Sequence, residues 1–257
     1  MRRCFDIKNA VSFFQKGPIE IVVGKGSHTF PYHSHQSFLV GVVESGEARF
    51  VIGDAKYLLQ EGMTYLVPPD VGMSITPAGP YQYLTICIKD EGKTRCGNPG
   101  LFVIENVGKR IVDLCEGFRS GHVSDEQFMG QLGTILWQTD IKESCEGHVS
   151  ASVRDAVRYI QQHVNDKFTL DHLARNVHLS KYHLVRIFKN EMGVTPKQYD
   201  QQCKIRAAKK SIMEEEREAD IAADLHFSNQ SHLCSMFKRY MGISLGDYRS
   251  SVEIKEQ

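Results

Sequence analysis

The chain has 257 residues, of which 41% are hydrophobic and 24% are charged, and its formal net charge at pH 7 is zero. This composition is typical of a globular protein with enough material for two domains, and no apolar stretch is long enough to cross a bilayer. The N-terminal residues lack the apolar core of an export signal, and the seven cysteines form no CxxC pair, so a cytoplasmic protein with reduced thiols is expected.

Residues 19–88 have the pattern of many short β-strands. Stretches rich in Val, Ile, Tyr and Phe alternate with turn residues such as Gly46, Gly62 and Pro68. This pattern predicts a sandwich or a small barrel, whose mouth can hold one small ligand. The predicted strands are Ile19–Val23, Phe38–Val43, Ala48–Ile52, Tyr57–Leu59, Met63–Val67, Met73–Ile75 and Tyr83–Ile88.

Two histidines separated by one residue stand early in this region. On a strand, His33 and His35 would share one face, because side chains alternate between faces. Two imidazoles on one face can bind a divalent metal. Alternation alone also predicts a set of barrel-lining residues that contact a small-molecule effector: Phe30, His33, His35, Phe38, Tyr65 and Tyr83.

The HxH pattern, together with Gly46, Gly62 and Pro68, resembles the cupin barrel over roughly residues 24–88. The resemblance fails at two metal positions, where Leu39 replaces the metal-binding Glu and Met73 replaces the last His. Two ligands are too few for a good metal site, so no metal and no cofactor are predicted. The histidines are interpreted as polar residues at the barrel mouth, with contact between one of them and a ligand as the alternative.

Helical spacing replaces the strand pattern between residues 105 and 139. Apolar residues recur every three or four positions in two blocks, with Gly121 and Ser124 between them. This predicts an antiparallel helix pair that either packs on the barrel or forms the seam of a homodimer. Trp137 is predicted to pack. The predicted organisation is an effector-binding or dimerisation domain over 1–142, a polar linker over 143–151 and a helical domain over 152–257.

The second half of the sequence contains an internal repeat. A short helix, a turn and a longer helix recur at an offset of 48 to 49 residues, which is a helix-turn-helix shape. Ser152 with Asp155 is predicted to cap the first helix of this half, and Ser180 to cap the helix Lys181–Met192. Thr195 and Pro196 start a long helix that holds the two units apart.

Residues 153–250 resemble the DNA-binding domain of the AraC/XylS family of transcription factors. With the cupin-like region in front, the resemblance covers nearly the whole chain. It implies a seven-helix domain in a one-component regulator that is not an enzyme, binds double-stranded DNA, responds to a small-molecule effector and forms a homodimer; RNA polymerase is a further partner. The residues on which the resemblance rests include Leu173-Ala174, Phe188-Lys189, Gly193, Thr195-Pro196, Ile221-Ala222, Phe237-Lys238, Gly242 and Tyr248.

Three positions depart from the family pattern: His226 replaces the usual Gly, Leu245 replaces a Pro, and Ser235 replaces an Arg that relatives often carry. A His tolerates the positive φ of a turn at some cost, and a Leu only weakens a cap, so neither change alters the predicted fold. Ser235 predicts a weaker or less specific contact by the second unit.

The outward residues of the two longer helices have the chemistry of DNA recognition. Arg186 can make two hydrogen bonds to a guanine edge, and Gln230 can pair with an adenine edge. Lys189, Lys238 and Arg239 suit phosphates, which position the protein without specifying sequence. The residues predicted to face DNA are Ser180, Lys181, Tyr182, Val185, Arg186, Lys189, Asn229, Gln230, Ser231, His232, Ser235, Lys238 and Arg239.

Two other functions remain open from the sequence. One is a metal-dependent cupin enzyme fused to a DNA-binding domain, which the missing Glu and His ligands disfavour. The other is a dimeric regulator without an effector. The sequence identifies neither the effector nor the target genes, and it does not separate activation from repression.

Overall fold

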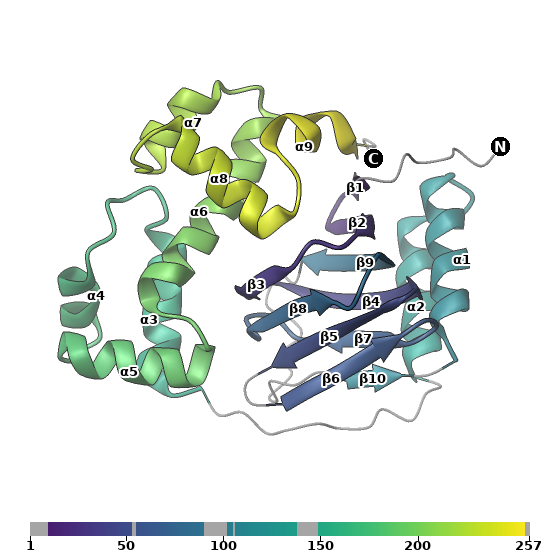
Figure 1. Cartoon of the computed structure of the whole chain (residues 1–257), viewed down its shortest axis with the longest axis horizontal. Coiled ribbons are helices and arrows are strands. Elements are labelled where there is room, and N and C mark those ends of the chain that lie inside the picture. Colours follow the sequence, from purple (N-terminus) through teal and green to yellow (C-terminus); the bar gives the residue numbers. More distant parts are fainter. Residues whose placement is uncertain (1–9, 53–54, 90–101, 105, 138–148, 255–257) are drawn as a thin grey trace.

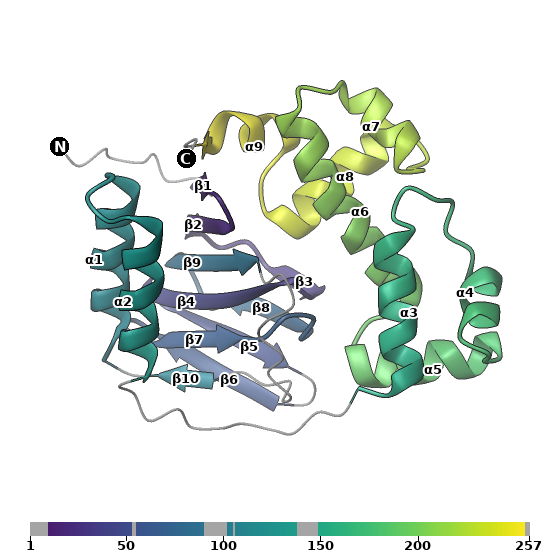
Figure 2. The same ribbon diagram turned by 180° about the vertical axis from the view of Figure 1, so that it is seen from behind.

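The structure is a computed structural model that describes residues 10–52, 55–89, 102–104, 106–137 and 149–254. A β-rich part carries a pair of helices on one side, and a group of helices lies on the other (Figures 1 and 2). The predicted linker over 143–151 lies outside the described residues except for its last three positions. In the described part of the chain, no helix is both long and apolar enough to span a membrane.

The strands form two sheets. One has the order β10-β7-β4-β9-β2-β1-β11 and the other the order β3-β8-β5-β6. The bounds are β1 Ala10–Lys16, β2 Ile19–Gly26, β3 Phe30–His33, β4 Ser37–Ser45, β5 Glu47–Ile52, β6 Ala55–Gln60, β7 Thr64–Val67, β8 Met73–Pro77, β9 Tyr81–Lys89, β10 Phe102–Ile104 and β11 Val252–Ile254.

Every predicted strand corresponds to an observed one, and the β-rich N-terminal domain is confirmed. The prediction missed β1, β3, β10 and β11. In β1, Phe13 and Phe14 are both buried, on opposite faces of the sheet, so the strand lacks an alternation of apolar and polar residues. The cupin barrel itself remains a prediction.

Strand β4 shows how the larger sheet serves two cores. Val40 and Val42 point towards the helix pair, α1 (Gly108–Arg119) and α2 (Asp125–Trp137). Leu39 and Val43 point between the two sheets. Aromatic contacts hold the helices on their side of the sheet. The ring of Phe118 meets Phe14 edge-on, with centroids 5.8 Å apart, and lies tilted against Phe128, with centroids 4.4 Å apart.

The helix pair is confirmed, but the prediction for Trp137 is wrong, because 91% of its surface is exposed. The buried side of α2 is formed by Phe128, Leu132 and Ile135, at the expected spacing of three to four residues. Trp137 follows Ile135 by two positions, which turns its side chain away from that stripe.

The second half consists of α3 (Ala151–Gln162) and two helix-turn-helix units joined by α6 (Pro196–Met213). The units are α4 (Leu170–Asn176) with α5 (Lys181–Met192), and α7 (Glu218–Asp224) with α8 (Gln230–Met241); α9 (Leu245–Ser251) follows. Each unit has a helix of 7 residues before a helix of 12, which confirms the duplication.

Matching turns connect the helices within the two units. His178 and His226 take positive φ values of 55° and 56°, so the His that replaces the family Gly adopts the turn conformation. Both longer helices end at a left-handed glycine, Gly193 and Gly242. Thr195 and Gln198 form the capping box that starts α6.

One local prediction needs correction. The N-cap of α3 is Ser150, whose side chain accepts a hydrogen bond from the Val153 backbone, and Ser152 lies inside the first turn. In the second unit, Glu218 and Asp220 lie in the first turn of α7, where the positive end of the helix dipole favours negative charge.

The C-terminal helices contact the larger sheet directly. Phe13 of β1 belongs to the same buried cluster as α7, α8, α9 and the end of α6, and its ring meets Tyr248 edge-on at 4.8 Å. Strand β11 pairs in parallel with β1. The predicted boundary at residue 152 remains a prediction, and β11 belongs to the sheet of the N-terminal part.

Candidate functional site

The first candidate surface is the outward face of α5. Leu184, Phe188 and Met192 are buried and fix the helix on its own core. The opposite side is open: Tyr182 is 89% exposed, and Arg186 and Lys189 are exposed as well. Ser180 caps the helix by accepting a hydrogen bond from the His183 backbone at 3.3 Å. Val185 is half-buried on this face, and Lys181 is exposed.

Two of these side chains have neighbours of their own. Lys181 forms an ion pair with Asp171 of α4 at 2.9 Å, and both groups are exposed. The Nη2 atom of Arg186 lies 3.2 Å from Nδ1 of His183. An exposed ion pair contributes little free energy, so a phosphate can replace Asp171 as the partner of Lys181 at small cost.

The second candidate surface is the outward face of α8. Asn229 caps the helix and accepts a hydrogen bond from the His232 backbone at 2.8 Å. Ser231, Ser235, Lys238 and Arg239 are exposed. The two remaining predicted residues are engaged. The amide of Gln230 donates to Glu218 at 2.8 Å, and the half-buried His232 packs its ring edge-on against Phe227 at 5.4 Å.

Helix α6 connects the two surfaces. Its 18 residues span about 27 Å at 1.5 Å per residue. Its first half packs in the core of the first unit and its second half in the core of the second. Because one continuous helix belongs to both cores, the two outward faces are held in a fixed relation.

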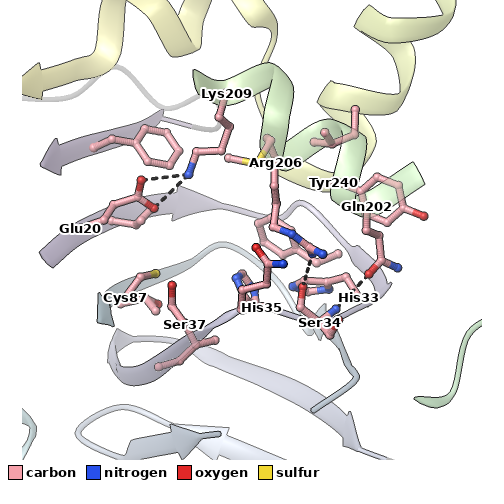
Figure 3. A pocket seen from close by; sticks show the side chains of 18 of the residues that line it. Glu20, His33, Ser34, His35, Ser37, Cys87, Gln202, Arg206, Lys209 and Tyr240 are labelled. Atoms are coloured by element: carbon pink, nitrogen blue, oxygen red, sulfur yellow. Dashed lines mark hydrogen bonds and ion pairs between the residues drawn. The ribbon is translucent and has the colours of Figure 1, made fainter. Parts of the chain in front are cut away.

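The third candidate site is a cavity of about 1030 Å³ between the β-rich part and the helices (Figure 3). The strand side contributes aromatic and apolar side chains, and α6 contributes Gln202, Arg206 and Lys209. Of the predicted effector residues, Phe30, His33, His35, Tyr65 and Tyr83 line this cavity. Phe38 does not, because the register of β4 turns it towards the helix pair.

Hydrogen bonds cross the boundary between strands and helices beside this cavity. The Nη1 atom of Arg206 donates to the backbone oxygen of Ser34 at 3.0 Å. The side chain of Gln202 donates to the Tyr32 backbone oxygen at 3.1 Å and accepts from the Ser34 backbone at 3.2 Å. These contacts attach α6 to the segment that follows β3.

A second crossing contact joins the loop after β7 to α6 and α3. The hydroxyl of Tyr199 donates to Asp70 at 2.7 Å, and the amide of Gln161 donates to the Tyr199 hydroxyl at 2.8 Å. Burial raises the pKa of Asp70, and the hydrogen bond from Tyr199 opposes this rise.

An ion pair forms the third crossing contact. The Nζ atom of Lys209 lies 2.9 Å from a carboxylate oxygen of Glu20 on β2, and their side chains are 20% and 14% exposed. Burial lowers the pKa of Lys209, but the charge and the hydrogen bond of Glu20, together with Tyr248 and Cys87, outweigh burial, so the pKa is raised overall. The ammonium also lies 5.4 Å from the ring centroid of Phe13 and 5.5 Å from that of Tyr248.

His33 and His35 meet at the cavity, but only His33 lies on a strand, so the strand prediction is wrong for His35. Strand β3 ends at His33, and His35 lies in the following segment, yet the ring centroids are 4.9 Å apart. Burial lowers the pKa of His33 to about 4, and burial lowers that of His35 well below its ordinary value. No group of three or more His, Cys, Asp or Glu side chains suited to a metal occurs in the described ranges.

Sequence reasoning missed Glu20 and the polar face of α6 as parts of this site. Gln202, Arg206 and Lys209 follow the spacing i, i+4, i+7, which places them on one side of a helix and was the available signal. Nothing around Glu20 marks it, because its partner lies 189 residues away in the chain.

Comparisons with known proteins agree with both halves of the fold. A helix-turn-helix domain model matches residues 173–251, and a model of the AraC-like ligand binding domain matches residues 21–89. The chain is 25% identical over 235 residues to the uncharacterised HTH-type transcriptional regulator YbfI of Bacillus subtilis (strain 168), covering 79% of this chain and 81% of that protein.

Further similarity extends over most of the chain. The probable transcriptional regulator LumQ of Photobacterium leiognathi is 25% identical over 87% of this chain and 92% of its own length. Among solved structures, ToxT of Vibrio cholerae O395 superposes with a TM-score of 0.62 at 14% identity, covering 92% of this chain and 98% of that one, and shares the fold.

The duplicated helix-turn-helix, the β-rich domain in front of it and the two matching family models lead to one assignment. The chain belongs to the AraC family of transcriptional regulators, with an N-terminal ligand-binding domain and a C-terminal helix-turn-helix DNA-binding domain.

Proposed function

We propose that this regulator reads two successive major-groove segments with α5 and α8, and that a small molecule in the interdomain cavity alters this binding. The observation that carries the proposal is the position of α6. This helix connects the two outward faces and also forms one wall of the cavity.

The division of roles on DNA follows from exposure and chemistry. Arg186 and Tyr182 supply base contacts from α5, with Lys189 on a phosphate. On α8 the exposed set is less discriminating, because Ser231 and Ser235 are short and Gln230 is engaged by Glu218. The first unit therefore carries more of the sequence specificity.

Coupling requires a ligand that binds one arrangement of the domains better than another. The cavity supports such a preference, because both domains form its walls. Beside it, Arg206, Gln202 and Lys209 of α6 form hydrogen bonds with the β-rich part, so a ligand that alters these contacts favours one arrangement of the domains. Structures of ToxT include one with an unsaturated fatty acid bound, which supports a small-molecule ligand in this fold.

The proposal is tested by selecting binding sites from random double-stranded DNA with the native chain and with Arg186→Ala. The expected result is a motif with two contacts about one helical turn apart, of which the variant blurs the half read by α5. Arg158→Ala is the control, because Arg158 is exposed on α3 and pairs with the exposed Asp155 of the same helix. Failure to enrich any sequence with the native chain would contradict the proposal.

We also propose a homodimer through the exposed side of α2. Met129 is 41% exposed and Trp137 is 91% exposed, and two helical turns separate them on one side of the helix. Sedimentation velocity on the native chain and on Met129→Glu tests this. A dimer that the substitution dissociates supports the surface, and a monomeric native chain contradicts it.

A further inference from the structure

We propose that the interdomain cavity binds a monocarboxylate with a large apolar body, whose carboxylate is held by Arg206 and Ser34. This inference rests on the proposed function, because it names the ligand class of the same cavity. It follows from the charges, the unpaired donors and the apolar lining of the cavity, in that order.

Among the described residues that line the cavity, Arg206 is the partly buried cation that has no ion-pair partner. Lys209 is paired with Glu20 at 2.9 Å, and Lys210 points outward with 81% of its side chain exposed and Glu214 at 3.6 Å. Lys89 is exposed at the rim. Within the described residues, Arg206 has no carboxylate oxygen closer than 4.0 Å.

The remaining carboxylate beside the cavity, Asp70, is near enough for the charge of Arg206 to lower its pKa, but among the described residues the two groups form no ion pair within 4.0 Å. The Oδ1 atom of Asp70 accepts hydrogen bonds from Tyr199 and Gln161. The guanidinium cannot lose its proton to escape the cost of burial, so a ligand anion is the species that offsets its charge. One unmatched cation calls for a monoanion.

The hydrogen-bond donors indicate where that anion sits. Arg206 donates through Nη1 to the Ser34 backbone oxygen and through Nη2 to the sulfur of Cys203, each at 3.0 Å. In the part of the chain that the structure describes, its buried Nε has no partner, and neither does the hydroxyl of Ser34, a residue only 4% exposed. Figure 3 shows these two side chains next to each other at the cavity wall.

Nε and Nη2 form one edge of the guanidinium, and this edge matches the two oxygens of a carboxylate. Its present acceptor, the sulfur of Cys203, is weak. A carboxylate on this edge satisfies Nε, replaces the sulfur with oxygen and brings an acceptor to the Ser34 hydroxyl. Both unpaired donors are thereby explained by one ligand group.

The rest of the cavity selects the body of the ligand. Tyr81 and Tyr83 stack at 5.1 Å between ring centroids, and Phe30, Met73 and Ile75 add further apolar wall. A cavity of about 1030 Å³ lined in this way suits a ligand with a substantial aromatic or aliphatic body, which the hydrophobic effect holds in place.

The test compares carboxylates with matched neutral amides on the full-length protein. The probes are decanoate, 4-phenylbutanoate and 2-naphthylacetate, each against its primary amide, with Kd from titration calorimetry and stability from thermal unfolding. We expect at least one carboxylate to bind and to raise the Tm, and its amide to bind roughly tenfold more weakly or worse.

Two variants locate the head group. Arg206→Gln is expected to weaken carboxylate binding roughly tenfold or more and to leave amide binding within about twofold. Ser34→Ala is the sharper variant, because removing an unpaired buried hydroxyl keeps or raises the Tm of the free protein while weakening the carboxylate severalfold. Arg158→Gln is the control and changes neither.

The outcomes separate this inference from the proposed function. Amides that bind as tightly as their acids, carboxylate binding that ignores Arg206→Gln, or no carboxylate bound up to about 1 mM each overturn the ligand class. Carboxylate binding through Arg206 that leaves DNA affinity unchanged supports the ligand class and contradicts the coupling. A neutral ligand that binds the cavity and shifts DNA affinity supports the coupling and contradicts the ligand class.

Discussion

Lys189 on α5 tests whether contacts that position the protein on the phosphate backbone are separate from contacts that recognise bases. Its ammonium is exposed beside the positions that we propose to contact bases, so it suits a phosphate. We expect Lys189→Ala to weaken binding about equally on all sequences and to lower the salt dependence of log K by about 1. Fluorescence anisotropy over a salt series measures both. A loss confined to one base position would assign Lys189 to base reading instead.

Arg186→Ala should behave in the opposite way. It should lose roughly 1–3 kcal/mol of discrimination at one position of the site. Each of the two variants, Lys189→Ala and Arg186→Ala, therefore serves as the control for the other within one helix.

His33 gives the protein a pH dependence with a definite sign. Its folded pKa of about 4 lies below the ordinary value of 6.5, because burial disfavours the charged ring. The unfolded chain therefore binds more protons between these values, and stability is complete above pH 6.5 and declines as pH falls towards 4. The loss is on the order of 3 kcal/mol for this residue alone.

Urea unfolding at several pH values between 4 and 7 measures this decline. His33→Asn preserves a donor for the Pro31 oxygen, which the His33 ring contacts at 2.7 Å, and removes the titration. Its stability should fall less steeply with acid than that of the native chain, with His35 contributing the remaining slope. Equal slopes for the two proteins would show that His33 is not buried in its neutral form.

At the scale of elements, α6 offers a matched pair of adjacent lysines. Lys209 pairs with Glu20 in a mostly buried setting, whereas Lys210 pairs with Glu214 at the surface. Lys209→Met leaves Glu20 partly buried without its partner, which should lower the free energy of unfolding by about 2–4 kcal/mol. Lys210→Met should change it by less than about 0.5 kcal/mol.

Chemical denaturation of both variants and of the double variant Glu20→Gln, Lys209→Met decides the point. The double variant should recover part of the loss, because it leaves no unpaired charge. Similar losses for Lys209→Met and Lys210→Met would mean that the pair with Glu20 is solvated.

The elements also show what the sequence could and could not predict. The helix Lys181–Met192 and the start of the long helix at Pro196 were predicted as the structure has them, because Ser180 and Thr195 are N-cap residues that mark where these helices begin. Strand β1 was missed because both of its faces are buried. The side to which Phe38 points was predicted wrongly, since it depends on the pairing of β4 with β9 and not on local composition.

Only the strand side of the cavity could be predicted from the sequence, for a similar reason. Alternation identified its strand residues, but its charged wall depends on contacts between segments 172 and 189 residues apart in the chain. No local pattern encodes that Arg206 meets Ser34 or that Lys209 meets Glu20. Such pairings exist only once the two halves are packed together.

At the scale of the whole molecule, each DNA-reading unit has its own attachment to the β-rich part. The first unit is held through Asp70 and Tyr199, a residue of α6 that packs in the core of this unit. The second is held through Phe13, Tyr248 and the ion pair of Lys209 with Glu20. The relation between the two outward faces is therefore set by α6 and also by a common support, which links the cavity to both.

This double attachment predicts how DNA binding responds when one attachment is lost. Lys209→Met loosens only the second unit, so affinity for a site with both halves should change by about fivefold or more, while affinity for the α5 half-site alone stays within about twofold. Anisotropy titrations with the full site and the half-site measure this, and Lys210→Met is the matched control. If both DNAs respond equally, the substitution acts through general stability; if neither responds, α6 alone fixes the two faces and the cavity has no route to the DNA.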